Sequence, residues 1–229
     1  MLFVLAPAVL CLLFAVLLIW AEYKKGNEAR VLFKTVASMF FLMLGVIAAL
    51  FAMSSYRLWI LAGLACSVFG DVFLAFFDND QTKAHLFEWG VIAFGCAQVC
   101  YSIYFILWGG FSLWSLLITA VIACAALSGI RVFHMDVRGF LPALAVYSAL
   151  LCFAFANAFM TMLGQLSATD GMPVCSIVAA AGMGLFLLSD LFLLFKYFKP
   201  GAPKSLTLFN LSTYYLAQVC LGVSGMLFL

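Results

Sequence analysis

Charged residues are scarce in this sequence. Asp, Glu, Lys and Arg together make up only 9% of its 229 residues, whereas 68% are hydrophobic and the mean hydropathy is +1.22. An average soluble domain is about half apolar and about a quarter charged. The composition therefore excludes a soluble domain of this size and indicates a polytopic membrane protein.

Histidine is scarcer still, since only His85 and His134 are present and both lie in polar segments between apolar runs. A histidine-bound zinc site inside the membrane therefore has no ligands, and a Ser-His or Cys-His nucleophile pair has no base at that depth. The eight cysteines lie within or at the ends of apolar runs, without the paired loop spacing of disulfides or zinc sites. We predict no metal site.

The apolar runs are long enough to cross a membrane, which takes roughly 20 helical residues per crossing. The longest charge-free run, residues 89–130, is too long for one crossing and breaks at Gly109-Gly110. The first run has no basic residue before it and no small-x-small cleavage site, so we predict a retained helix and not a signal peptide. The predicted fold is an all-α membrane protein, with residues 1–229 as a single integral membrane domain. Its eight transmembrane helices are expected over residues 2–21, 33–53, 57–77, 86–107, 111–130, 140–162, 173–195 and 206–228.

Basic residues set the predicted orientation. Arg57 lies on one side of the predicted helices, and the other ten Lys and Arg residues lie on the opposite side. Because basic residues accumulate on the cytoplasmic side, that side is predicted to be cytoplasmic and both termini to be non-cytoplasmic. The ten residues are Lys24, Lys25, Arg30, Lys34, Lys83, Arg131, Arg138, Lys196, Lys199 and Lys204.

Two carboxyl groups lie inside apolar runs: Asp71 in SVFGDVFLAFF (67–77) and Asp190 in GLFLLSDLFLLF (184–195). An ionisable residue at bilayer depth is costly unless it faces a cavity or a partner, so its default interpretation is functional. The alternative is structural: a buried ion pair with Lys34 or a hydrogen-bonded acid.

The two halves of the chain share these features at a nearly constant offset. Asp71 and Asp190 are 119 residues apart, and the tetrapeptide AQVC recurs 120 residues apart, at 97–100 and 217–220. The alternative is a chance match, because apolar helices are built from a small number of residue types. We predict a 4+4 parallel internal repeat, with halves of about 1–110 and 111–229. Parallel repeats would place both acids on opposite walls of one cavity, about 10 Å from the cytoplasmic end of their helices.

Other polar residues at helical spacing are expected to face the acids. For Ser67 and Asn210, packing between membrane helices explains the residue equally well. The candidates for substrate contact are Lys34, Ser67, Gln98, Tyr147, Asn210, Tyr214 and Gln218.

Two carboxyl groups in a water-poor site can divide the chemistry between them. Burial and a neighbouring carboxylate both favour the neutral form of one carboxyl group, which can then act as a general acid while the other acts as a base. The residues support hydrolysis by acid–base catalysis but do not identify the substrate.

The pattern resembles the lysoplasmalogenase family of YhhN-like membrane proteins over nearly the whole chain. Its marks are Lys34, SxxGD at 67–71, GxxxF at 90–94, Tyr147, FLLSD at 186–190 and YxxAQ at 214–218. One departure is Gln98, at a position where the family often carries a histidine. This substitution could change the rate, the pH optimum or the substrate.

The resemblance implies hydrolysis of the vinyl-ether bond of lysoplasmalogens to a fatty aldehyde and a glycerophospho-head group, without metal or cofactor. It assigns acid–base catalysis to Asp71 and Asp190 and leaves open which of them is the acid and which is the base. It also makes Lys34 a candidate for binding the substrate phosphate. Tyr147, Tyr214 and Gln218 would orient the acids or the glycerol. The expected partners are a lysophospholipid substrate and membrane lipids, and no nucleic acid. No eukaryotic retention or lipidation signal is present, so we expect a bacterial inner membrane, with the site reached from the cytoplasmic leaflet.

Two rival functions use the same acids. A proton-coupled transporter of small molecules or lipids could use Asp71 and Asp190 as a proton relay, although the helices that carry them lack the central proline of a broken helix. A hydrolase of another lipid, ether or epoxide is the second rival.

Overall fold

The predicted eight-helix architecture is confirmed. The computed structural model describes residues 2–24, 27–51, 57–137, 139–168 and 173–225, and within these ranges it contains helices and no strand. All eight helices are long and apolar enough to cross a membrane, as expected for an integral membrane protein. They are α1 (Leu2–Lys24), α2 (Asn27–Phe51), α3 (Arg57–Asn79), α4 (Ala84–Gly109), α5 (Leu113–Val132), α6 (Leu141–Ala168), α7 (Val174–Phe198) and α8 (Ser205–Ser224).

The break between α4 and α5 lies at the predicted glycine pair. Gly110 has φ 82°, in the left-handed region that favours glycine, and its N–H donates to the carbonyl of Ile106 at the end of α4. The Ser112 side chain then accepts from the Trp114 N–H and caps α5. The three residues 110–112 are therefore enough to reverse the chain direction between two spans.

Several helices extend beyond the predicted spans. α2 begins at Asn27 rather than 33, and α6 ends at Ala168 rather than 162. Backbone hydrogen bonding continues through polar residues after the apolar run has ended, so hydropathy marks the hydrocarbon limits and not the helix ends. The predicted helix ends at 53 and 226–228, and the basic residues Lys25 and Arg138, lie outside the described residues.

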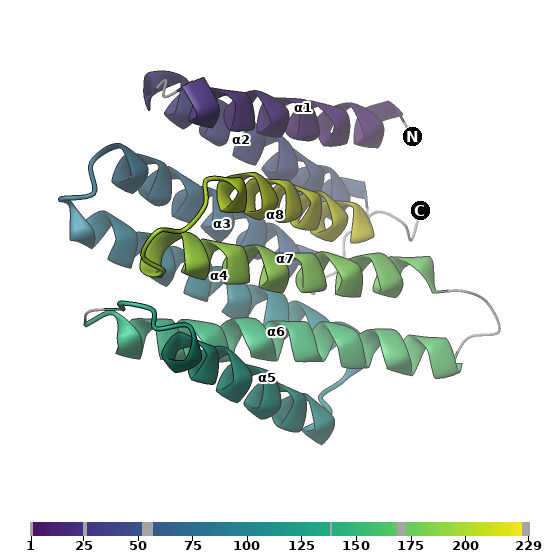
Figure 1. Ribbon diagram of the computed structural model, residues 1–229. Coiled ribbons are helices and arrows are strands. Elements are labelled where there is room, and N and C mark those ends of the chain that lie inside the picture. Colours follow the sequence, from purple (N-terminus) through teal and green to yellow (C-terminus); the bar gives the residue numbers. More distant parts are fainter. Residues whose placement is uncertain (1, 25–26, 52–56, 138, 169–172, 226–229) are drawn as a thin grey trace.

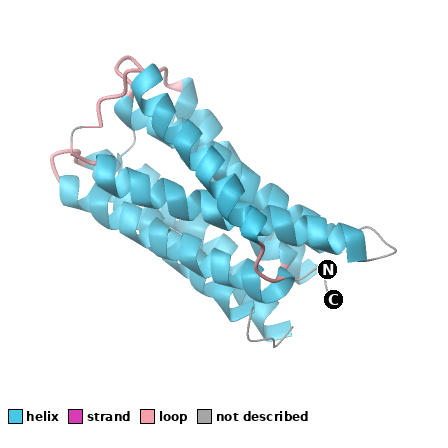
Figure 2. Ribbon diagram, turned by 90° about the horizontal axis from the view of Figure 1, so that it is seen from below, coloured by secondary structure: helices cyan, strands magenta, loops and turns pink. Residues whose placement is uncertain are grey.

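The helices run lengthwise beside one another in one bundle (Figures 1 and 2). α1 and α2 form one flank and α5 the other, with α3, α4, α6, α7 and α8 between them (Figure 1). α1 packs on α2 and α8, whereas α5 packs on α6. α1 and α5 both expose many large apolar side chains, as a lipid-facing helix does.

Matching helix pairs pack in the two halves of the chain. The pairs α1–α2, α2–α3 and α3–α4 correspond to α5–α6, α6–α7 and α7–α8, and α4–α6 corresponds to α8–α2. A parallel repeat would produce this arrangement. The repeat itself and the placement of the termini across a membrane stay predictions.

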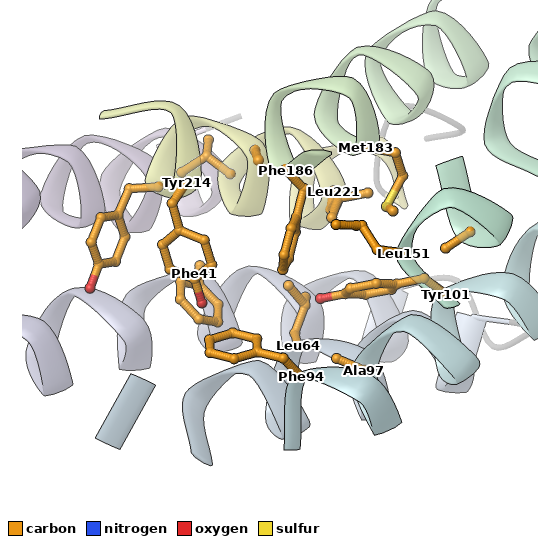
Figure 3. Packing of buried hydrophobic residues seen from close by; sticks show 14 of the residues in the cluster. Phe41, Leu64, Phe94, Ala97, Tyr101, Leu151, Met183, Phe186, Tyr214 and Leu221 are labelled. Atoms are coloured by element: carbon orange, nitrogen blue, oxygen red, sulfur yellow. The ribbon is translucent and has the colours of Figure 1, made fainter. Parts of the chain in front are cut away.

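Aromatic rings from four helices fill the core between the halves (Figure 3). Tyr214 makes edge-to-face contacts with Phe94 and Phe186, at centroid distances of 6.0 and 5.5 Å. Small residues make room for these rings, since a Cβ atom at Gly70 would lie 2.6 Å from the Phe94 ring. Glycine at this position lets α3 and α4 approach closely just before Asp71.

Candidate functional site

One cavity of about 90 Å³ lies between α2, α3, α4, α6, α7 and α8, and a single residue of α5 reaches it. Asp71 and Asp190 both line this cavity, as do four of the candidate substrate-contacting residues. Those four are Lys34, Tyr147, Asn210 and Tyr214. Residues from both halves of the chain therefore meet around one cavity.

Asp71 is buried, with 2% of its surface exposed, and it has three polar partners. Tyr214 donates its hydroxyl hydrogen to Oδ2 over 2.8 Å, and Ser38 donates to the same atom over 2.6 Å. The Lys34 ammonium forms an ion pair with Oδ1, with Nζ at 3.9 Å. A cation and two hydroxyl donors satisfy a buried carboxylate, so this environment favours the ionised form of Asp71.

Asp190 has a different environment. It is partly buried, and Tyr147 donates its hydroxyl hydrogen to Oδ2. No ion pair with a basic side chain is found for Asp190 in the described part of the chain. Most of the cavity wall beside it is apolar, with Leu187, Leu191 and Leu194 from its own helix. A carboxyl group without a cation in such surroundings is more stable when neutral.

Ser67, Gln98 and Gln218 lie behind the cavity wall and are not among its lining residues. The Tyr101 hydroxyl joins two of them, since it donates to Oε1 of Gln218 over 3.2 Å and lies 3.2 Å from the Ser67 oxygen. The Gln98 amide is buried beside the Tyr147 hydroxyl, with which it interacts. Substrate contact by these three residues stays a prediction.

Asn210 lines the cavity but also joins two helices. Its Nδ2 atom donates to the carbonyl of Ser189 over 3.0 Å and to the Ser189 hydroxyl over 2.9 Å, while that hydroxyl bonds back to the Asn210 carbonyl. These three hydrogen bonds join α7 to α8. Asn210 therefore has the role in helix packing that was the alternative to substrate contact.

A second polar group lies at the loop end of the bundle, and sequence reasoning did not assign it a role. The Asp78 carboxylate accepts from the Lys196 ammonium over 3.3 Å and from the Tyr197 hydroxyl over 2.9 Å. This group joins the end of α3 to the end of α7. The sequence shows an acidic residue at the end of α3 and a basic residue at the end of α7, but nothing in it indicates that these two ends meet.

Five aromatic residues surround that group and form what we term the loop-end aromatic cluster, in which neighbouring ring centroids lie 5.1–6.5 Å apart. Three of them, Phe87, Tyr197 and Phe198, also line the cavity. The cluster therefore covers the end of the cavity nearest the α3–α4 and α7–α8 loops. Its members are Phe77, Phe87, Phe140, Tyr197 and Phe198.

The arrangement places two carboxyl groups of unlike environment around one small space. Within the described ranges, no three His, Cys, Asp or Glu side chains lie close enough together to hold a metal ion. Proton donation by one carboxyl group, with charge stabilisation by the other, is the chemistry that these residues can perform directly.

Comparison with protein families gives one match, in which the model of the YhhN family covers residues 29–225. A search of curated proteins and a search of solved structures gave no match. The matched range begins in α2 and includes every residue that lines the cavity.

Proposed function

Because the chain belongs to the YhhN family of lysoplasmalogenase-like membrane proteins, we propose that it hydrolyses the vinyl-ether bond of lysoplasmalogens. The products are a fatty aldehyde and a glycerophospho-head group. One observation carries the proposal: Asp71 and Asp190 line the same cavity, Asp71 beside a cation and two hydroxyl donors, and Asp190 beside the Tyr147 hydroxyl.

The unlike environments assign the two roles. Asp190, without a cation, carries a proton and acts as the general acid. Asp71, paired with Lys34, stays a carboxylate and supplies negative charge. A fixed charge in a site of low dielectric stabilises an opposite charge that develops beside it far more than it would in water.

The proposed reaction begins with transfer of the Asp190 proton to the β-carbon of the vinyl ether. The π bond between the two carbons is lost, their single bond remains, and an oxocarbenium ion forms, which Asp71 stabilises. Water then adds to the α-carbon and returns one proton to the Asp190 carboxylate. The resulting hemiacetal collapses to the aldehyde and the free hydroxyl of the head group, so atoms and charge balance and the enzyme regains its starting state.

Lys34 has a different role here from the one that the family resemblance implied. Its ammonium is paired with Asp71, so in this mechanism it holds that carboxylate ionised. Contact between Lys34 and the substrate phosphate stays a prediction, as do the bacterial inner membrane and access from the cytoplasmic leaflet.

The decisive test is aldehyde release from lysoplasmenyl-ethanolamine by the detergent-purified protein. Asp71→Asn and Asp190→Asn keep the side-chain size and remove the titratable group, and each is expected to lower turnover by about 100-fold or more. Asp80→Asn is the matched control, because Asp80 lies in the α3–α4 loop, outside the cavity, and full turnover is expected.

Absence of aldehyde from the unmutated protein between pH 5 and 9 would exclude the vinyl-ether reaction. Proton-coupled transport, the rival function, would then be measured in liposomes. A carrier would move protons with its solute and would lose that coupling in the same two Asp→Asn variants.

A further inference from the structure

The cavity has a closed wall and a partly open one. On α3, α4 and α8 its lining residues other than Val91 are buried, including Leu74, Phe94 and Tyr214. On α7 most lining residues retain some exposure, as do Tyr147 and Ser148 of α6, and Leu191, which follows Asp190 directly, is 37% exposed. The open side of the cavity therefore lies on the flank formed by α6 and α7.

The loop end of the cavity does not provide an alternative route. Phe87 and Phe198 of the loop-end aromatic cluster are buried, and they cover that end by edge-to-face packing at 5.8 Å. The Asp78–Lys196 ion pair holds the adjoining ends of α3 and α7 together. A molecule that approached along the bundle axis would have to displace these rings.

The open flank is apolar. Besides Leu191, the cavity is lined there by Leu187 and Leu194 of α7 and by Ala126 of α5, which lies across from them. In a chain whose helices span a membrane, a leucine-lined flank contacts hydrocarbon chains and not water. A cavity of this kind, open on one side, can hold the reactive end of a long-chain lipid while the chain extends through the opening.

We propose that a lateral portal lies between α6 and α7 at Leu191, through which one hydrocarbon chain of a membrane lipid projects from the cavity into the bilayer. This inference rests on the proposed function and specifies its substrate class as membrane-resident single-chain lipids. A two-chain lipid would have to bring its second chain through the same opening. The aldehyde product leaves sideways into the bilayer.

Photocrosslinking tests the portal without requiring turnover. A non-hydrolysable 1-O-alkyl lysophospholipid with a diazirine midway along its chain is bound to the full-length protein, irradiated, and mapped by mass spectrometry. We expect crosslinks on the facing segments 144–152 and 187–194, removed by excess unlabelled lipid. Competed crosslinks confined to the loop-end aromatic cluster, or no competed crosslink at all, would overturn the portal.

A pair of tryptophan variants tests the same portal by kinetics. Leu191→Trp narrows the opening, and Leu216→Trp is the matched control, since Leu216 is a similarly exposed leucine (42%) on α8 that does not line the cavity. We expect Leu191→Trp to lower kcat/KM for a long-chain lysoplasmalogen by at least about tenfold, while Leu216→Trp stays within about twofold. For a short-chain vinyl-ether analogue, Leu191→Trp should cause a clearly smaller loss than for the long-chain substrate, because the analogue has no chain to pass through the opening.

Equal losses in the two tryptophan variants, or an equal loss on both substrates in Leu191→Trp, would overturn the portal. Failure of the proposed function gives a different result. In that case the unmutated protein releases no aldehyde from either substrate, while the crosslinking pattern still reports where the lipid chain lies.

Discussion

The Nζ atom of Lys34 lies 3.9 Å from Oδ1 of Asp71, and this ion pair joins α2 to α3 at the buried wall of the cavity. Both side chains are almost fully buried. Removing one partner of a buried pair leaves an uncompensated charge, which is far more costly than removing both. The pair therefore links the stability of the bundle to the ionisation of a proposed catalytic residue.

Replacing Lys34 with Met should lower the free energy of unfolding by about 3–5 kcal/mol and should abolish most aldehyde release, because Asp71 would no longer be held ionised. The double variant Lys34→Met/Asp71→Asn should recover most of the stability but none of the activity. Thermal unfolding in detergent, read beside turnover, checks both. Full activity in Lys34→Met would contradict the role of Asp71 as a fixed negative charge.

The two tyrosine hydroxyls that reach the acids should differ in importance. Asp190 has Tyr147 as a donor, whereas Asp71 retains Lys34 and Ser38 when Tyr214 loses its hydroxyl. Tyr147→Phe should therefore lower kcat by about tenfold or more, equivalent to about 1.4 kcal/mol, and Tyr214→Phe by a smaller factor. Steady-state kinetics on the two variants measure the difference. A larger loss in Tyr214→Phe would reverse the assignment of the general acid.

The Asn210–Ser189 contact should stabilise the α7–α8 pair. Asn210→Ala removes the donor of two hydrogen bonds to Ser189 and should cost about 1–3 kcal/mol. Ser189→Ala should cost less, since the backbone carbonyl still accepts. The double variant should cost less than the sum of the two, because the partners share one contact. Additive losses would show that the two side chains act independently.

Two glycine-to-alanine variants test the packing, because their effects on the free energy of unfolding should have opposite signs. A Cβ atom at Gly63 would lie 2.3 Å from the Tyr101 ring, whereas nothing lies within 4 Å at Gly164. Gly63→Ala should therefore destabilise the fold by about 1–3 kcal/mol. Gly164→Ala, near the C-terminal end of α6, should stabilise it by up to about 1 kcal/mol. Unfolding midpoints in one detergent compare them directly, and a neutral Gly63→Ala would mean that Tyr101 relaxes freely.

The sequence was sufficient for the spans because apolar length alone determines which segments can cross a membrane. The pair Gly109-Gly110 even separated two spans that share one charge-free run. The helix ends were less predictable. At Lys196–Phe198, for example, α7 continues past its apolar run because the Asp78 carboxylate accepts from Lys196 and Tyr197, and that partner is 118 residues away.

Helical spacing identified which residues share one face of a helix, but not where along the bundle each of them lies. Asn210, Tyr214 and Gln218 follow one another at intervals of four residues and so share one face of α8, yet of the three only Asn210 and Tyr214 line the cavity. Gln218 lies one turn further along and meets Tyr101 instead. Which helices close around a residue depends on contacts such as α4–α6 and α2–α8, and a period of 3.6 residues carries no information about them.

The contact between Asp78, Lys196 and Tyr197 also governs how the bundle can move. It fixes the end of α3 to the end of α7, and both helices run to it in the same direction from Arg57 and Val174. Any relative motion of the two helices that keeps this contact is therefore smaller at this end than at the opposite end. Asp71 and Asp190 lie about two helical turns from the contact. Such a motion would change their spacing less than it would change that of the remote ends of their helices.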